Sequence, residues 1–242
     1  QGVPVIACDC EVCKSTNPKD SRLRTSIMLS ENDKNVVIDS GPDFRQQILR
    51  TRIRTLEGIV FTHEHKDHVA GLDDVRAFNF AEKKDMPVFC HARVTEALKR
   101  EFSYIFDNNP YPGIPKIQVH EIDKAPFKVG GFELTPIEVM HYKLPVLGFR
   151  TKNFCYITDA KTIRPEEIEK IKGTEILMVN ALRRTEHISH FNLEQALDFI
   201  ELIGPKKAYL THISHLMGKH EAVEKELPDN VRIAYDGLEF EC

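Results

Sequence analysis

The sequence has no long hydrophobic run, and this absence excludes a helical membrane span. A transmembrane helix needs roughly 20 consecutive apolar residues, and no segment of the chain approaches that length. The first residues, Gln1-Gly2-Val3-Pro4, also lack the basic and apolar regions of a secretory signal. We therefore expect a cytoplasmic protein with no membrane partner.

An excess of charge of one sign is also missing. The formal net charge is -4 and the pI about 6.3, which gives no global attraction to nucleic acid and makes it an unlikely partner. Repeats and low-complexity tracts are absent too. A chain of 242 residues that is 41% hydrophobic and 29% charged has the composition of an ordinary globular protein. We expect one domain.

Short apolar runs alternate with helical patterns along most of the chain. Runs rich in β-branched residues predict buried strands, and they lie at 35–39, 58–63, 86–91, 175–182 and 206–213. Capping signals and apolar periodicity predict helices at 43–51, 73–82, 93–104 and 164–171, and from Asn192 onward. Between about Lys116 and Asp159 consecutive strands replace the alternation, with Gly130-Gly131 at a turn. The pattern indicates sheets packed between helical layers.

The loop after the strand Gly58 to Phe61 is unusually rich in potential metal ligands. His63, His65, Asp67 and His68 lie within six residues. Loops at strand ends in layered α/β folds collect ligands, because the sheet fixes the loop while leaving it accessible. Imidazole nitrogen and carboxylate oxygen suit Zn²⁺, and Mn²⁺ or Fe²⁺ accept the same mixed set. Four such ligands can serve two adjacent metals.

One loop cannot complete two metal coordination shells, so further ligands are expected at other strand ends. His141, Asp159 and His212 each follow an apolar strand-like run. Each alone would be an unremarkable polar residue. Their repeated placement after a strand makes them candidate ligands.

The motif H-x-H-x-D-H and these three later residues resemble the metallo-β-lactamase superfamily over nearly the whole chain. The resemblance implies an α/β fold, a four-layer αββα sandwich formed by residues 1–242, with a dinuclear metal site. It assigns His63, His65 and His141 to one metal, Asp67, His68 and His212 to the other, and Asp159 as the bridge. Two divalent ions, Zn or Mn, would lower the pKa of a bridging water to give hydroxide for hydrolysis. Asp67 could also orient this nucleophile.

Three cysteines near the N-terminus predict a second kind of site. Cys8, Cys10 and Cys13 could supply three thiolates to a structural zinc, which usually has four ligands. His215, three residues after His212, could be the fourth ligand. The alternative is a surface loop with reduced cysteines.

This combination resembles the PhnP family of cyclic phosphodiesterases, through "GVPVIACDCEVC", "HYKLPVLGF", "THISH" and "SHFNLEQAL". The resemblance implies that Cys8, Cys10, Cys13 and His215 hold one structural zinc. It also implies that His190 binds the substrate phosphate or donates a proton to the leaving oxygen. Family members normally begin with one more strand, which is missing before Gln1.

We therefore predict a metal-dependent phosphodiesterase acting on a small cyclic or nucleotide-like phosphodiester, such as a phosphoribosyl cyclic phosphate. A homodimer is possible by analogy with related enzymes. One alternative is a tRNA 3′-processing nuclease of the RNase Z type, which shares the metal motif but generally needs a basic arm. Another is a non-catalytic binding module in which metals only support the fold. Thioester or lactam hydrolysis is a minor alternative.

Overall fold

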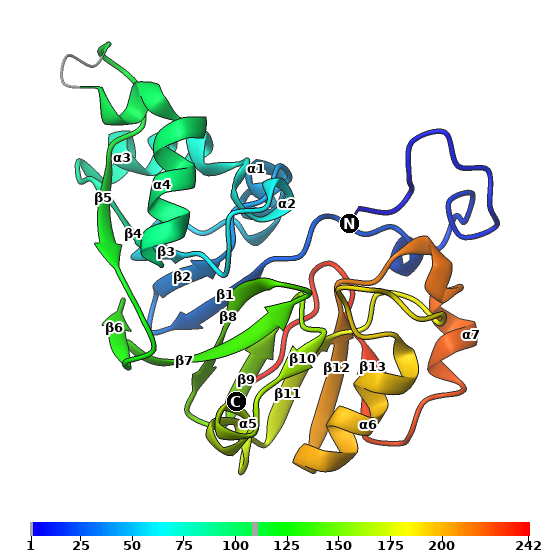
Figure 1. Cartoon of the computed structure of the whole chain (residues 1–242). Helices are drawn as coiled ribbons and strands as arrows, with labels where there is room; N and C mark the ends of the chain where they lie inside the picture. The colour runs from blue at the N-terminus through cyan, green and yellow to red at the C-terminus, as the bar shows by residue number, and fades with distance from the viewer. Residues whose placement is uncertain (1, 108–110) are drawn as a thin grey trace. The chain divides into compact units, whose positions relative to one another are not determined.

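The protein is described by a computed structural model, which covers residues 2–107 and 111–242. The chain forms two compact units. Unit 1 comprises Gln1–Leu23 and Thr135–Cys242, and unit 2 comprises Arg24–Leu134. Each unit has its own sheet and its own helices (Figure 1). The assignment of residues 1–242 to a single domain stays a prediction.

Unit 2 contains a five-stranded sheet and most of the short helices. Its elements are β1 (Ile27–Glu31), β2 (Lys34–Ile38), α1 (Phe44–Thr51), β3 (Gly58–Val60), α2 (Lys66–Val69), the 3-10 helix η2 (Leu72–Val75), α3 (Arg76–Glu82), β4 (Met86–Cys90), α4 (Ala92–Glu101), the 3-10 helix η3 (Ser103–Phe106), β5 (Ile117–Glu121) and β6 (Phe127–Val129).

The strands of this sheet lie in the order β1-β2-β3-β4-β5. Strands β1 and β2 form an antiparallel hairpin whose turn residues, Asn32 and Asp33, both have positive φ, as in a two-residue type I′ turn. All other pairs are parallel. Ile59 of β3, Val88 of β4 and Leu98 of α4 belong to one buried apolar core. Parallel pairing places the carboxyl ends of β2 and β3 at the same edge.

Unit 1 contains the other sheet. Its elements are the 3-10 helix η1 (Pro18–Asp20), most of β7 (Phe132–His141), β8 (Leu144–Thr151), β9 (Phe154–Ile157), β10 (Thr162–Ile163), α5 (Pro165–Ile171), β11 (Ile176–Asn180), α6 (Leu193–Ile203), β12 (Lys207–Thr211), the 3-10 helix η4 (His215–Met217), α7 (His220–Glu224) and β13 (Val231–Ile233).

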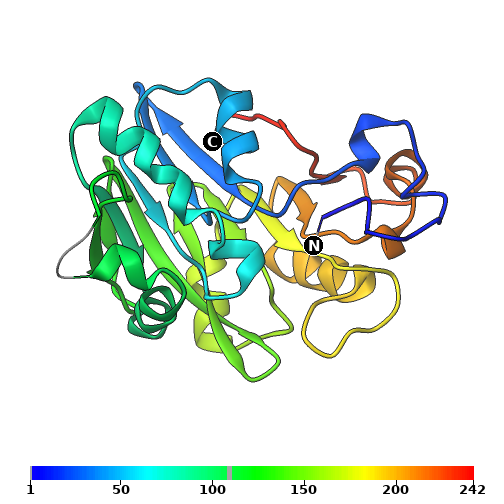
Figure 2. The same cartoon turned by 90° about the horizontal axis from the view of Figure 1, so that it is seen from above.

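The strand order in unit 1 is β10-β7-β8-β9-β11-β12-β13, with β6 pairing to the start of β7. Strands β7, β8 and β9 are antiparallel neighbours, whereas β9, β11, β12 and β13 pair in parallel. Helix α6 runs beside β11 and β12 (Figures 1 and 2), and its Phe199 and Ile200 pack with Val179 and Leu210 of those strands. The parallel strands therefore end at one common edge.

Most predicted elements are confirmed. Strands β3, β4, β11 and β12 lie within the predicted ranges, and β2 begins one residue before its predicted range. Helix α6 begins after Asn192, which forms a capping box with Gln195. The range 73–82 begins as η2 and becomes α3 only at Arg76, and α4 ends at Glu101 before η3. No helix in the described ranges is both long and apolar enough to cross a membrane.

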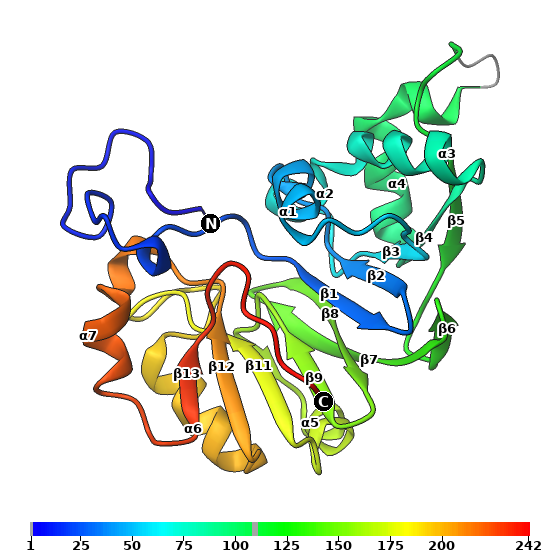
Figure 3. The ribbon, with the colours of Figure 1, turned by 180° about the vertical axis from the view of Figure 1, so that it is seen from behind.

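The predicted run of consecutive strands differs in one respect. Strand β5 pairs in parallel with β4, and the two strands lie side by side in the view from behind (Figure 3). The reason is α4, which connects these two strands as the crossover that a parallel pair requires. Only the strands from β6 to β9 form an antiparallel meander.

Candidate metal centres

The histidine-rich loop of unit 2 follows β3 directly. His65 is the N-cap of α2, and its carbonyl accepts hydrogen bonds from the backbone N–H groups of His68 and Val69. The ring centroid of His63 lies 4.6 Å from that of His65 and 4.2 Å from that of His68. Nε2 of His68 lies 3.8 Å from Oδ2 of Asp67. The four predicted ligands of this loop are therefore brought together.

Asp39, at the carboxyl end of the neighbouring strand β2, accepts hydrogen bonds from residues of this loop. Its carboxylate is completely buried and accepts hydrogen bonds from the Thr62 backbone N–H (2.8 Å), the Thr62 hydroxyl (2.8 Å) and Nδ1 of His68 (2.7 Å). Burial raises the pKa of Asp39, and these donors act in the opposite direction. Sequence reasoning missed this residue, although it carries the signal used for Asp159: a polar residue directly after an apolar strand.

These hydrogen bonds fix which ring nitrogen carries the proton. His68 donates its Nδ1 proton to Asp39, so its lone pair is on Nε2. The Thr62 hydroxyl uses its only proton on Asp39 and can therefore only accept from Nδ1 of His63, 2.9 Å away. His63 consequently has its lone pair on Nε2 as well. Metal-binding histidines are typically oriented by such second hydrogen bonds.

Two glycines allow this loop to pack against the segment after β2. A Cβ atom on Gly41 would lie 2.2 Å from the carbonyl oxygen of Asp67, and one on Gly71 would lie 2.1 Å from the carbonyl oxygen of Gly41. The backbone N–H of Gly71 also donates to the carbonyl of Ser40. Only residues without a side chain permit this approach, and the contact fixes the position of Asp67.

The two charged residues interspersed in the motif lie away from the histidines. Glu64 forms an ion pair with Arg93 at 2.8 Å, and Lys66 forms one with Glu101 at 2.6 Å. Lys66 is exposed, whereas Glu64 is half-buried. The two ion pairs connect the loop to the first turn and to the last residue of α4.

The remaining predicted ligands lie in unit 1, at strand ends. His141 ends β7, Asp159 follows β9 and His212 follows β12. Nε2 of His212 lies 3.4 Å from Oδ1 of Asp159. One ligand atom each of His141, Asp159 and His190 lies within 4.8 Å of the others. Asp159 and His212 have positive φ values of 56° and 53°, an uncommon conformation that turns both side chains at the strand ends.

The loop after Asp159 is fixed by a buried amide. Asn180, the last residue of β11, accepts a hydrogen bond from the Ala160 backbone N–H at 2.7 Å and donates one to the Ala160 carbonyl at 3.0 Å. The Thr158 hydroxyl donates to Oδ2 of Asp159 at 2.6 Å. Asp159 is thus positioned from both sides by its own strand and the next one.

His141 is oriented in the same way as the histidines of unit 2. Its Nδ1 atom lies 2.8 Å from the carbonyl oxygen of Ser189. A carbonyl can only accept, so His141 donates through Nδ1 and has its lone pair on Nε2. Ser189 therefore contributes through its backbone, a role that its sequence does not reveal.

His190 lies among the candidate ligands of unit 1. Its ring centroid is 4.4 Å from that of His141 and 5.0 Å from that of His212, and its Nδ1 is 3.6 Å from Asp159. Burial lowers the pKa of the His190 ring to about 3, while the charge of Asp159 acts in the opposite direction. The family resemblance implied that His190 lies beside the substrate phosphate, but it did not indicate which residues surround it. The structure locates it next to Asp159.

The cysteine cluster forms a separate group within unit 1. The Sγ atoms of Cys8, Cys10 and Cys13 lie 3.2, 3.4 and 3.5 Å from Nδ1 of His215. Ligands bound tetrahedrally at zinc distances of 2.0–2.3 Å are about 3.6 Å apart, so these atoms fit the four corners of a zinc site. The backbone N–H of Cys13 and the ring of His215 lower the pKa of the Cys10 thiol to about 6. A thiol of that kind readily becomes the thiolate that zinc binds.

The sequence matches the family model described as "Beta-lactamase superfamily domain" over residues 34–213. A solved structure described as a new diphosphatase from the PhnP family is 36% identical. It superposes with a TM-score of 0.91 over 98% of this chain and 91% of that one. The Zn²⁺-bound PqqB of Methylobacterium extorquens is 18% identical, with a TM-score of 0.79 over 100% and 96% of the two chains. The last similarity shows the fold alone.

One relative of known sequence is much longer. A protein of Porphyromonas gingivalis named octanoyltransferase is 39% identical over 241 residues, which is 98% of this chain and 49% of that protein. The chain thus spans about half the length of this relative. The name belongs to the whole relative, including the half that has no counterpart in this chain.

Proposed function

Because this chain belongs to the metallo-β-lactamase superfamily, a family of hydrolases with the same two-sheet α/β fold, we propose that it is a metal-dependent phosphodiesterase with a dinuclear centre. In this proposal His63, His65 and His141 would hold one divalent ion, Asp67, His68 and His212 would hold the other, and Asp159 would be shared by both. When bound, two such ions supply hydroxide near neutral pH and compensate the negative charge of a phosphoryl group.

The observation that carries the proposal is the protonation of the histidines. His63, His68 and His141 each have Nδ1 engaged as a donor, to Thr62, Asp39 and the Ser189 carbonyl respectively. Each therefore has its lone pair on Nε2, which is the state that binds a metal. Chance placement of histidines gives no reason for all three to have the same tautomer.

The remaining candidate residues would act on the substrate or hold a structural zinc. His190 lies beside Asp159 and His141, and we propose that it binds a phosphoryl oxygen or donates a proton to the leaving oxygen. Asp67, at the start of α2 and fixed by the contact of its carbonyl with Gly41, would orient the attacking water in addition to binding metal. Cys8, Cys10, Cys13 and His215 would hold a structural zinc that attaches the N-terminal segment to η4.

The proposed substrate is a small phosphodiester, cyclic or nucleotide-like. A second candidate substrate is a diphosphate, because the 36%-identical relative is described as a diphosphatase. Both reactions displace an oxygen leaving group from a phosphoryl group, so one site can serve either. The formal net charge of -4 argues against a tRNA substrate.

The test is hydrolysis of bis-p-nitrophenyl phosphate by protein loaded with Mn²⁺ or Zn²⁺. We expect turnover in the wild type and a loss of at least about 100-fold in kcat for His65→Ala and for Asp159→Asn. His91→Asn is the matched control, because His91 is a histidine outside the site that caps α4, and asparagine is also a good N-cap. Full activity in His65→Ala would contradict the proposed site. An inert metal-loaded wild type would contradict the proposed activity and favour a non-catalytic binding module.

A further inference from the structure

His187 lies close to the candidate site but differs from the candidate ligands in its protonation. Its ring centroid is 5.0 Å from that of His190. Its Nδ1 atom accepts a hydrogen bond from the backbone N–H of Ser189 at 3.3 Å. The neutral ring therefore carries its proton on Nε2. A protonated Nε2 cannot bind a metal, but it can donate a hydrogen bond to an anionic oxygen.

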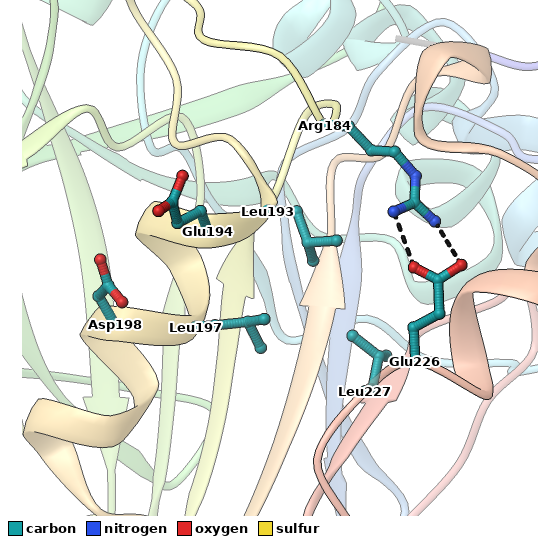
Figure 4. A pocket seen from close by; sticks show the side chains of 7 residues that line it. All are labelled: Arg184, Leu193, Glu194, Leu197, Asp198, Glu226 and Leu227. Carbon is teal, nitrogen blue, oxygen red and sulfur yellow. Dashed lines mark hydrogen bonds and ion pairs between the residues drawn. The ribbon is translucent and has the colours of Figure 1, made fainter.

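The loop that presents His187, residues 183–191, is fixed at several points. Arg184 forms a two-bond ion pair with Glu226 at 2.8 and 2.9 Å, at the edge of a pocket beside α6 (Figure 4). Its Nε donates to the carbonyl of Met217. Arg183 donates to two carbonyls of its own loop, those of Thr185 and Glu186. Bidentate arginine pairs of this kind hold geometry well.

The far end of the loop is fixed by the sheet. The backbone N–H of Phe191 donates to the carbonyl of Ala160 at 2.7 Å, and that of Leu182 donates to the carbonyl of Phe191. Nδ1 of His141 donates to the carbonyl of Ser189. The donor of His187 is thus preorganised, since the loop that carries it is attached to the segments that carry His141 and Asp159.

The positions of the histidine rings indicate which group the Nε2–H donor of His187 would contact. His190 contacts both His141 and Asp159, whereas His187 contacts His190 and lies one ring further along the row. His187 is half-buried, and the next residue, Ile188, is 66% exposed. A phosphoryl group bound by His190 would therefore lie near the Nε2–H donor of His187.

We propose that His187 is a substrate-binding residue that donates Nε2–H to a second phosphoryl group, and that the substrate is a diphosphate diester. This rests on the proposed function and names its substrate class. In the reaction one water is consumed. Its oxygen bonds to one phosphorus, the bridging P–O bond breaks with its electron pair on the leaving phosphate, and the two protons pass to the two monoesters or to solvent.

The test compares two substrates in the metal-loaded protein. Diadenosine diphosphate, which yields two AMP molecules, has the second phosphoryl group, and bis-p-nitrophenyl phosphate lacks it. For His187→Phe we expect kcat/KM on the diphosphate to fall about 10–100-fold, the effect of losing a hydrogen bond to a charged group. The activity on the simple diester should change less than about twofold. His187→Gln, which retains an N–H donor, should recover several-fold.

A binding measurement separates recognition from catalysis. The methylene analogue of the diphosphate cannot be hydrolysed at the bridge, and calorimetry should show about 10-fold weaker binding to His187→Phe than to the wild type. Ile188→Ala is the matched control and should bind as the wild type does. Equal losses on both substrates in His187→Phe, or no loss on either, would overturn the inference.

The outcomes also separate this inference from the proposed function. A wild-type protein that hydrolyses the simple diester but not the diphosphate would overturn the substrate class alone. A wild-type protein inert to both would overturn the proposed function, and the inference with it.

Discussion

Nδ1 of His68 lies 2.7 Å from Oδ2 of Asp39, and both side chains are almost completely buried. A buried carboxylate beside a histidine commonly orients the ring for a metal and makes its other nitrogen more basic. Asp39 follows β2 and His68 follows β3, and these strands are parallel neighbours. The sheet of unit 2 therefore determines the orientation of a candidate ligand.

Replacing Asp39 by asparagine should weaken metal binding about 10–100-fold while leaving the fold intact. Asparagine has nearly the same shape but can present an N–H to Nδ1 of His68, which removes the preference for the correct tautomer. Competition with a chelator followed by metal analysis measures the effect. Asp43→Asn is the control, because Asp43 bonds to Arg24 and to no histidine. Equal metal affinity in Asp39→Asn and wild type would refute the role of Asp39.

Replacing Gly41 by alanine should displace the metal-binding loop. The new Cβ would lie 2.2 Å from the Asp67 carbonyl oxygen, so one of the two segments must move. Such overpacking costs about 1–3 kcal/mol. We expect a lower free energy of unfolding together with weaker metal binding, measured by denaturant titration and chelator competition. The neighbouring and exposed Pro42→Ala should change neither quantity much.

Replacing Cys10 by serine should remove one metal per chain and loosen the N-terminal segment. Its sulfur is one of three cysteine Sγ atoms that lie 3.2–3.5 Å from Nδ1 of His215, and a structural zinc contributes directly to folding free energy. Elemental analysis should show the loss, and limited proteolysis should cleave within residues 1–20 faster. Cys242→Ser, at an exposed cysteine, is the control. Unchanged metal content in Cys10→Ser would exclude a zinc at this cluster.

Stability should fall as the pH decreases below about 6.5, partly through His220. Burial lowers the pKa of His220, and the nearby cations Arg22 and Lys19 lower it further, against Glu224 and Asp20. A histidine with a lowered folded-state pKa takes up its proton more readily when unfolded. The unfolded state is therefore favoured progressively from its own pKa near 6.5 down to the lower folded-state pKa.

His220→Asn should reduce this dependence by up to about 1.4 kcal/mol per pH unit within that window. The asparagine oxygen can still accept the hydrogen bond that Arg22 donates to Nδ1 of His220. The free energy of unfolding is measured at pH 7.5 and at pH 5.0 in both proteins. Parallel pH curves for wild type and variant would show that His220 does not contribute.

The position of polar side chains at strand ends was predictable because it depends on the local sequence pattern. The apolar run before His63 and those before Asp159 and His212 identify each strand, and the polar residue after it is then a candidate ligand. The same reasoning predicted α6 from its Asn192 cap. The structure brings Cys8, Cys10, Cys13 and His215 together within unit 1, and their binding of zinc stays a prediction.

Residues that act through backbone or second hydrogen bonds were not predictable in the same way. Ser189 contributes a carbonyl, which any residue could supply, and its partner His141 lies 48 positions earlier. Asp39 carries the strand-end signal but lies outside the histidine motif. The tautomer of His187 depends on a backbone N–H whose direction follows from the folded loop, not from the sequence.

The most direct test of the account is an anomalous diffraction experiment on crystals of the Zn²⁺-loaded protein. It should reveal two adjacent metal peaks, roughly 3.5–4 Å apart as in two-metal hydrolases, one bound by His63, His65 and His141 and the other by Asp67, His68 and His212. Asp159 should contact both. A third, isolated peak is expected at the cysteines. Metal only at the cysteines, with none bound by the histidines, would contradict the proposed dinuclear hydrolase.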